Sequence, residues 1–184
     1  MNRNYQNFTL IVFLVFILAS CGGNNLNKIT FLSTTQASFT LEASEETPLE
    51  EGSFLWVDNI DEADNAELLI EDFNLEIDDI NNIIPEDVTL TLVDEGANWR
   101  AIRTVRLYLY NEDESDSILM ARLDTIPTNI NAEIELNPNN ESLRPYVIES
   151  ERGFKFKTLL ETRAQIITNY NYILTVISRV NGEI

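Results

Sequence analysis

The segment Asn169–Val176 reads NYNYILTV, and its alternation decides the fold class. Successive side chains of an extended chain point to opposite faces. One face of this segment therefore carries Tyr170, Tyr172 and two aliphatic residues, while asparagine, isoleucine and threonine lie on the other. A period of two over eight residues predicts a long β-strand with one face in the core.

Six other segments alternate in the same way. They are 38–41, 88–92, 103–110, its expected hairpin partner 118–123, 132–136 and 154–157. Pro85 is interpreted as a breaker ahead of the second of these. Eight or so strands without long helices predict an all-β fold of antiparallel sheets, most simply a two-sheet sandwich of immunoglobulin-like size.

Helical patterns are few and short. Asp61–Leu69 has acidic residues in its first turn, and one helical turn is expected in each of 98–103 and 141–147. The 184 residues suffice for one domain with a hydrophobic core. The prediction is therefore a single β-domain with a few short helical turns.

The chain is strongly acidic, with 31 Asp and Glu against 12 Lys and Arg and a formal net charge of −19. Such a charge repels nucleic acid and anionic membrane surfaces, because both are bound through lysine and arginine. We therefore expect no nucleic-acid partner. Solubility is the commoner reason for an acid excess, and a surface for cations or a basic partner is the alternative.

Histidine is absent, and the sole cysteine is Cys21. These counts exclude a Ser-His-Asp triad, a Cys-His pair, a histidine-ligated zinc site and an intrachain disulfide. No cofactor is indicated, and we expect the protein not to be an enzyme.

The N-terminus has the organisation of a signal peptide. A polar segment with Arg3 precedes the apolar run Phe8–Leu18. A helix of that length spans only about 16 Å, against about 30 Å for the hydrocarbon core of a bilayer, so a cleaved leader is expected rather than a permanent anchor.

The sequence Leu18-Ala19-Ser20-Cys21 resembles the lipobox of bacterial lipoproteins. The resemblance implies a diacylglycerol on the Cys21 thiol and cleavage just before that residue. The expected organisation is a signal peptide at 1–20, a lipidated tether at 21–28 and an acidic β-sandwich domain at 29–184. The alternative is an idle cysteine behind an ordinary secretory leader.

The resemblance also indicates a location in the cell envelope, with acyl chains on Cys21 holding the protein to a membrane. Residue 22, directly after the cysteine, is glycine rather than the aspartate that in some Gram-negative bacteria signals inner-membrane retention, and no early acidic cluster of the surface-export kind follows. These features favour the periplasmic face of the outer membrane over the cell surface or the inner membrane.

The mature part loosely resembles small uncharacterised β-sandwich lipoproteins of Gram-negative bacteria. The resemblance rests on the segments 87–92, 103–110, 143–147 and 154–157 and on the C-terminal strand. It implies a fold and no mechanism.

Two acidic runs are candidate sites for calcium, which takes oxygen ligands. In the run Asn111–Asp116 (NEDESD), Asp113 and Asp116 are weak candidates, because position six of a calcium loop counted from Asp113 is Ile118 rather than glycine. A solvated hairpin turn is the commoner interpretation. The run Asp58–Asp64 is the second candidate. The overall prediction is that the protein binds no metal.

Tyr108 and Tyr110 are the candidate ligand-binding residues. They share a strand face with Arg106, opposite an aliphatic stripe, so we expect them to be exposed. Exposed aromatic side chains stack on sugar rings or anchor a protein partner. Tyr170 and Tyr172, which continue an aliphatic face, are expected in the core.

Two functions remain open at this point. The first is a noncatalytic binding or structural domain that presents an acidic, partly aromatic face to an envelope protein or glycan. The alternative is a carboxylate-dependent hydrolase or carbohydrate-binding module of the envelope. A groove lined by the two tyrosines and a pair of carboxylates with raised pKa would favour the hydrolase.

Overall fold

The computed structural model describes residues 28–59, 77–111, 114–148 and 154–183, and most of them lie in β-strands. The strands are β1 (Lys28–Leu41), β2 (Phe54–Asp58), β3 (Ile80–Leu92), β4 (Ile102–Asn111), β5 (Ser117–Leu123), β6 (Glu133–Pro138), β7 (Phe154–Thr162) and β8 (Tyr170–Glu183). The short helical turns are η3 (Ile77–Asp79), η4 (Trp99–Ala101) and α1 (Arg144–Val147). The leader, Cys21 and the tether up to residue 27 lie outside the described residues.

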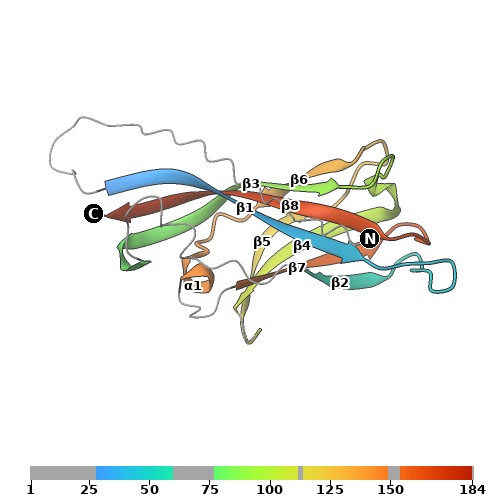
Figure 1. Ribbon diagram of the computed structural model, residues 1–184, viewed down its shortest axis with the longest axis horizontal. Helices are drawn as coiled ribbons and strands as arrows, with labels where there is room; N and C mark the ends of the chain where they lie inside the picture. Colours follow the sequence, from blue (N-terminus) through green and yellow to red (C-terminus); the bar gives the residue numbers. More distant parts are fainter. Residues whose placement is uncertain (1–27, 60–76, 112–113, 149–153, 184) are drawn as a thin grey trace, which may run out of the picture.

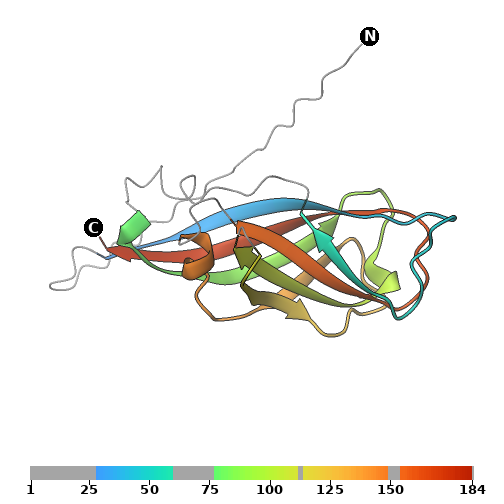
Figure 2. The same cartoon turned by 90° about the horizontal axis from the view of Figure 1, so that it is seen from below.

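All strand pairings are antiparallel and follow the order β1-β8-β3-β6-β5-β4-β7-β2. Only two residue pairs join β5 to β6, Ala121 with Pro138 and Arg122 with Asn137. The sheet curls along this order, and a bridge between Phe39 and Asn59 brings the β1 edge to the β2 side (Figure 1, Figure 2). The prediction of an all-β antiparallel fold is confirmed.

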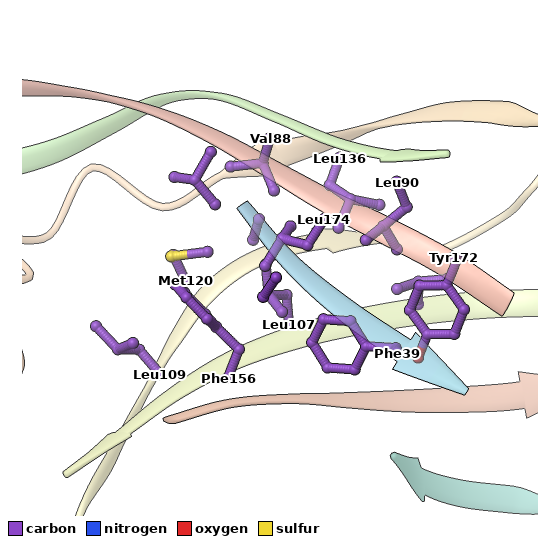
Figure 3. Close-up of a cluster of buried hydrophobic side chains, with 14 of the residues drawn as sticks. Phe39, Val88, Leu90, Leu107, Leu109, Met120, Leu136, Phe156, Tyr172 and Leu174 are labelled. Carbon is purple, nitrogen blue, oxygen red and sulfur yellow. The ribbon is translucent and has the colours of Figure 1, made fainter. Parts of the chain in front are cut away.

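The core fills the inside of this curl. In the close-up, side chains from β1, β3, β6 and β8 meet side chains from β4, β5 and β7 (Figure 3). Phe39 and its cross-strand partner Tyr172 stack with ring centroids 5.0 Å apart and an interplanar angle of 1°. Leu107, Leu109 and Met120 are fully buried in the same core cluster. The strands therefore hold together through one shared apolar interior.

The alternation in the sequence predicts the inward faces correctly. Tyr172, Leu174 and Val176 are buried, as are the aliphatic residues of β4. β8 continues beyond the expected end to Glu183 and pairs with both β1 and β3, which makes it central in its half of the sheet. A strand with neighbours on both sides and one buried face carries the clearest pattern.

The expectation that Pro85 breaks the chain before Val88 is wrong. β3 runs through the proline, which lies opposite Ser178 of β8. The register shifts between Pro85 and Asp87. A proline has no N–H for the ladder and is tolerated where a strand bulges, so the irregularity explains why the strand continues.

Two strands depart from the sequence expectation. β2 is not predicted by the alternation pattern, and β1 begins at Lys28, the last residue assigned to the tether. In β1 the pattern is inverted locally, since Leu32 is 47% exposed while Ser33 is 4% exposed. The apolar residues therefore do not mark the inward face at that point.

The short helical turns are partly as expected. η4 lies within 98–103, and Asn98 accepts a hydrogen bond from the Arg100 backbone N–H, as an N-cap does. α1 lies within 141–147 and has a proline in its first turn. The predicted helix at 61–69 lies outside the described residues.

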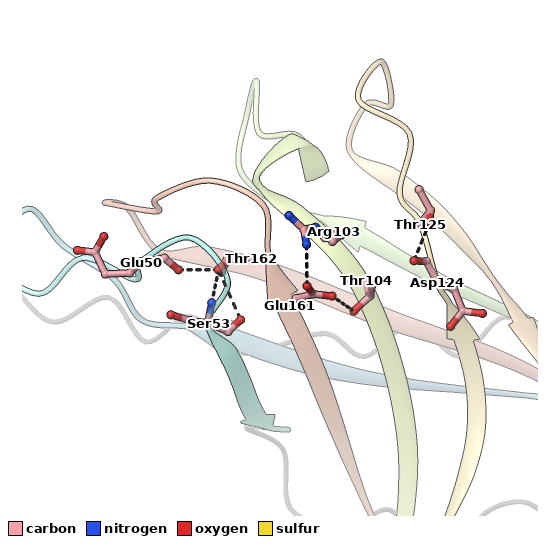
Figure 4. A network of polar contacts seen from close by, with 8 residues as sticks. All are labelled: Glu50, Ser53, Arg103, Thr104, Asp124, Thr125, Glu161 and Thr162. Atoms are coloured by element: carbon pink, nitrogen blue, oxygen red, sulfur yellow. Dashed lines mark hydrogen bonds and ion pairs between the residues drawn. The ribbon is translucent and has the colours of Figure 1, made fainter.

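A buried threonine fixes the turn that leads into β2 (Figure 4). The Thr162 hydroxyl donates to the Glu50 carbonyl at 2.6 Å and accepts from the Ser53 backbone N–H at 2.9 Å. Beside it, Glu161 accepts hydrogen bonds from Arg103 and Thr104. The bonds of Thr162 hold the start of β2 against β7 and so set the position of Trp56, while those of Glu161 join β7 to β4.

Ser33→Ala is expected to leave the free energy of unfolding unchanged or to raise it by up to about 1 kcal/mol. Among the described residues, the buried Ser33 hydroxyl has no hydrogen-bond partner, and it borders a cavity of about 20 Å³. Removing a buried hydroxyl without a partner relieves its desolvation cost. Urea unfolding of the variant tests this, and a loss above about 1 kcal/mol would contradict it.

Raising the pH above about 10 is expected to destabilise the fold through its buried tyrosines. Burial raises the pKa of Tyr172, whose hydroxyl bonds that of Thr158, and burial also raises the pKa of Tyr170. The contribution is present below the unfolded-state pKa and is lost as the pH rises through the folded-state pKa. Tyr172→Phe should lose about 1 to 3 kcal/mol at neutral pH, since Thr158 loses its partner, but should unfold with a weaker alkaline dependence. Equal alkaline slopes in urea unfolding would contradict the assignment.

Candidate functional site

The outer surface of β5, β4, β7 and β2 gathers aromatic and basic side chains. We call this surface the aromatic–basic face; it consists of Trp56 on β2, Arg106, Tyr108 and Tyr110 on β4, Arg122 on β5, and Lys155 and Lys157 on β7. The alternate residues of the same strands are buried, which directs these side chains outward.

Register brings the members of the aromatic–basic face together. Tyr108 lies opposite Lys157 of β7, and Tyr110 lies opposite Lys155. On the far side of β7, Leu159 lies opposite Trp56. Residues 45 or more apart in the chain are thus neighbours because β7 lies between β4 and β2.

Three rings form a compact cluster on this face. The centroid of Trp56 lies 5.2 Å from that of Tyr108 and 6.5 Å from that of Tyr110, and the tyrosine centroids are 6.4 Å apart. The interplanar angles are 51°, 81° and 52°. Trp56 and Tyr110 pack edge to face and the other two pairs are tilted, so the three rings present no flat platform.

The two tyrosines are half-buried rather than fully exposed, because Trp56 packs against them. Trp56 itself is 53% exposed, and Phe54 on the same strand is 64% exposed. Exposed aromatic residues beside arginine and tyrosine are the composition that protein interfaces favour. The prediction that Tyr108 and Tyr110 share the outer face with Arg106 is confirmed.

Two lysines converge on one carboxylate beside Tyr110. Glu114, in the turn between β4 and β5, accepts hydrogen bonds from Lys155 Nζ at 3.2 Å and Lys157 Nζ at 2.6 Å. Lys157 Nζ also lies 3.2 Å from Asp58 and 5.2 Å from the Tyr110 ring centroid. The second distance is within the range of a cation–π contact.

These contacts shift the pKa values of Glu114 and Lys157. The hydrogen bonds from Lys157 and Lys155 lower the pKa of Glu114. Burial alone would lower the pKa of Lys157, but its hydrogen bonds to Glu114 and Asp58 outweigh burial and raise it. Glu114 is therefore held as a carboxylate, which is the opposite of what a general acid requires.

Arg106 and Arg122 lie directly opposite each other on β4 and β5. Like charges in such cross-strand positions destabilise a sheet. Arg122 forms an ion pair with Asp124 at 3.4 Å. With the two lysines, these arginines place four of the chain's 12 basic residues on one face of an acidic protein.

The sequence predicts only part of the aromatic–basic face. An acidic, partly aromatic surface was expected, whereas the tyrosines lie among basic residues. The alternation in 154–157 places Lys155 and Lys157 on one strand face, but their convergence on Glu114 depends on the turn between β4 and β5. No alternation pattern in the sequence places Trp56 on this face.

The calcium candidates receive little support. Asp113 and residues 60–64 lie outside the described part of the chain. The Asp116 carboxylate accepts hydrogen bonds from Tyr146 Oη at 3.2 Å and the Ser117 backbone N–H at 2.8 Å. Within the described ranges, no group of three or more acidic, histidine or cysteine side chains is placed to hold a metal.

The other aromatic residues lie elsewhere. Trp99 and Tyr172 are buried, and Tyr170 is half-buried against Trp99, as expected for core packing.

Among the described residues, no helix is long and apolar enough to cross a bilayer. Neither the family models nor the curated proteins searched include a match to this sequence.

Proposed function

We propose that this chain is a noncatalytic, membrane-tethered binding protein of the bacterial cell envelope that docks a partner protein on its aromatic–basic face. The observation that carries the proposal is the cluster of Trp56, Tyr108 and Tyr110 among four basic side chains. Tryptophan, tyrosine and arginine are the residues that contribute most often to binding energy at protein interfaces.

The tether belongs to the same proposal. The lipobox-like residues ending in Cys21 would supply acyl chains, and Lys28, where β1 begins, is only seven residues later (28 − 21 = 7). Seven residues reach at most about 25 Å. The domain would therefore work close to the bilayer, at the periplasmic face of the outer membrane.

For the fold, we propose that the curled sheet corresponds to a two-sheet sandwich of immunoglobulin-like size. One layer would hold β1, β8, β3 and β6, and the other β5, β4, β7 and β2. In support, only two residue pairs join the layers between β5 and β6, and the core lies between them. The aromatic–basic face is then the outer surface of the second layer.

The alternative functions have less support. A hydrolase running on carboxylates needs a proton donor of raised pKa, whereas the pKa of Glu114 beside the tyrosines is lowered by the two lysines. A carbohydrate-binding module would use the rings as a platform, but they are tilted by 51° to 81° against one another. A glycan partner is accordingly an outcome that the tests must distinguish.

Site-specific photo-crosslinking in intact cells tests the proposal. A photoreactive amino acid at Tyr108 should yield a protein adduct that Trp56→Ala removes. The matched control is the same amino acid at Gln36, which is exposed on β1 in the other half of the sheet. Identical adducts from both positions, or no protein adduct from Tyr108, would contradict a docking role for this face.

A further inference from the structure

The turn between β4 and β5 places the side-chain carboxylate of Glu114 between two lysines. The backbone N–H of Glu114 donates to the Asn111 carbonyl at 3.0 Å, and Asn111 Oδ1 accepts from the Asp116 N–H at 3.1 Å. The Glu114 side chain then reaches Lys155 and Lys157 on the neighbouring strand. The resident occupant of the two-lysine site is thus a glutamate carried on a turn.

The turn places Glu114 in an unfavourable backbone conformation. Its φ is 58°, in the left-handed region that residues with a Cβ seldom adopt. A glycine would fit this position without steric cost. The protein keeps a glutamate there, and the contacts that its side chain makes are those with the two lysines.

The bound carboxylate is open to exchange. The side chain of Lys157 is 15% exposed, but those of Glu114 and Lys155 are 40% and 41% exposed, so water and other anions reach the Glu114–Lys155 pair. Ion pairs as exposed as this one contribute little to stability. Another carboxylate that gained contacts with the nearby rings would therefore compete effectively with Glu114.

We propose that Lys155 and Lys157 form a receptor for a glutamate or aspartate side chain of an acidic peptide segment on the partner, which displaces Glu114. The inference rests on the proposed docking role of the aromatic–basic face and adds the chemistry of the partner. Glu114 acts as an internal competitor that contacts both lysines in the unbound protein, while Asp58 pairs with Lys157 alone.

The rest of the face fits an acidic peptide. Arg106 and Arg122 oppose each other at the level of Leu159 on β7, two residues from Lys157, and no carboxylate of the described residues pairs with both of them. Side chains two residues apart on a strand are about 7 Å apart, so acidic residues along an extended peptide could reach both basic pairs. Trp56 and Phe54 would pack against its apolar side chains.

Titration of an N-acetylated hexaglutamate peptide into the purified full-length protein tests the receptor. At about 0.15 M salt the long-range repulsion from the acidic chain is largely screened. Glu114→Gln and Glu114→Gly should each bind about tenfold more tightly than wild type, as expected if Glu114 fills the site about nine-tenths of the time. Lys155→Gln combined with Lys157→Gln should weaken binding at least tenfold.

Glu135→Gln is the matched control, since it removes the same charge from an exposed position on β6. It should leave the affinity within twofold of wild type, and circular dichroism should show all variants folded. The proposal is overturned if both Glu114 variants bind as wild type does, if hexaglutamine binds equally well, or if oligogalacturonate binds and hexaglutamate does not. Crosslinking from Tyr108 that persists in the first case would leave the docking role standing and reject only the carboxylate receptor.

Discussion

Replacing Trp99 with alanine is expected to lower the free energy of unfolding by about 3 to 5 kcal/mol. The side chain is fully buried and packs against Tyr172 and Tyr170, with ring centroids 5.5 Å and 6.4 Å away. Its indole N–H donates to the Ala132 carbonyl at 2.7 Å. The substitution removes the largest fully buried side chain and leaves a cavity that the ladders of β3 and β8 cannot collapse to fill.

The second tryptophan of the chain provides a matched control. Trp56→Ala removes the same side chain from a position that is 53% exposed, so we expect a loss of less than about 1.5 kcal/mol. Trp99→Phe keeps an aromatic ring in the core but removes the indole N–H together with part of the side-chain volume. It should cost about 1 to 2 kcal/mol, because the Ala132 carbonyl keeps its bond from the Leu92 N–H. Urea unfolding followed by circular dichroism measures all three variants, and equal losses for both alanine variants would reject this account of the core.

The sequence predicts most strands because alternation is a local property. In β4, Val105, Leu107 and Leu109 are fully buried while the residues between them face outward, as their spacing requires. A strand that is buried on one face and solvated on the other must carry this pattern. It identifies the strands and their inward faces without any knowledge of their neighbours.

The strands that the pattern misses are those whose neighbours override it. β2 spans only Phe54–Asp58 and exposes Phe54 and Trp56, so its apolar residues point to both faces. β1 buries Ser33 and exposes Leu32. β3 passes through Pro85 with a shift in register. In each case the deciding contact comes from another strand.

In the candidate site, too, some features follow from the sequence of one strand and others depend on neighbouring strands. Tyr108, Tyr110 and Arg106 could be assigned to one face from the sequence, since they lie on one strand. Trp56 joins them only because β7 lies between β2 and β4, and that order is a property of the whole sheet. The placement of Glu114 depends on a backbone conformation that the composition of its turn does not specify. Positions on one strand were predictable, and contacts between strands were not.

Replacing Cys21 with alanine is expected to abolish lipid attachment completely. Cys21 is the only cysteine of the chain, and lipid transfer requires a thiolate nucleophile. Acyl chains contribute about 0.8 kcal/mol per buried methylene, so two or three chains hold a protein to a membrane where a single chain does not. The variant should take up no labelled palmitate and should remain as uncut precursor or be released from the membrane.

Ser20→Ala is the matched control, because it changes the neighbouring residue but keeps a small side chain before the cysteine. This variant should be labelled, cut and sedimented with membranes as wild type is. Cys21→Ser offers a hydroxyl of similar size and should behave like the alanine variant, since the hydroxyl is a far weaker nucleophile than a thiolate. Palmitate labelling that persists in either Cys21 variant would place the lipid elsewhere, and it would contradict the argument that a lipidated Cys21 holds Lys28, the first residue of β1, within about 25 Å of a bilayer.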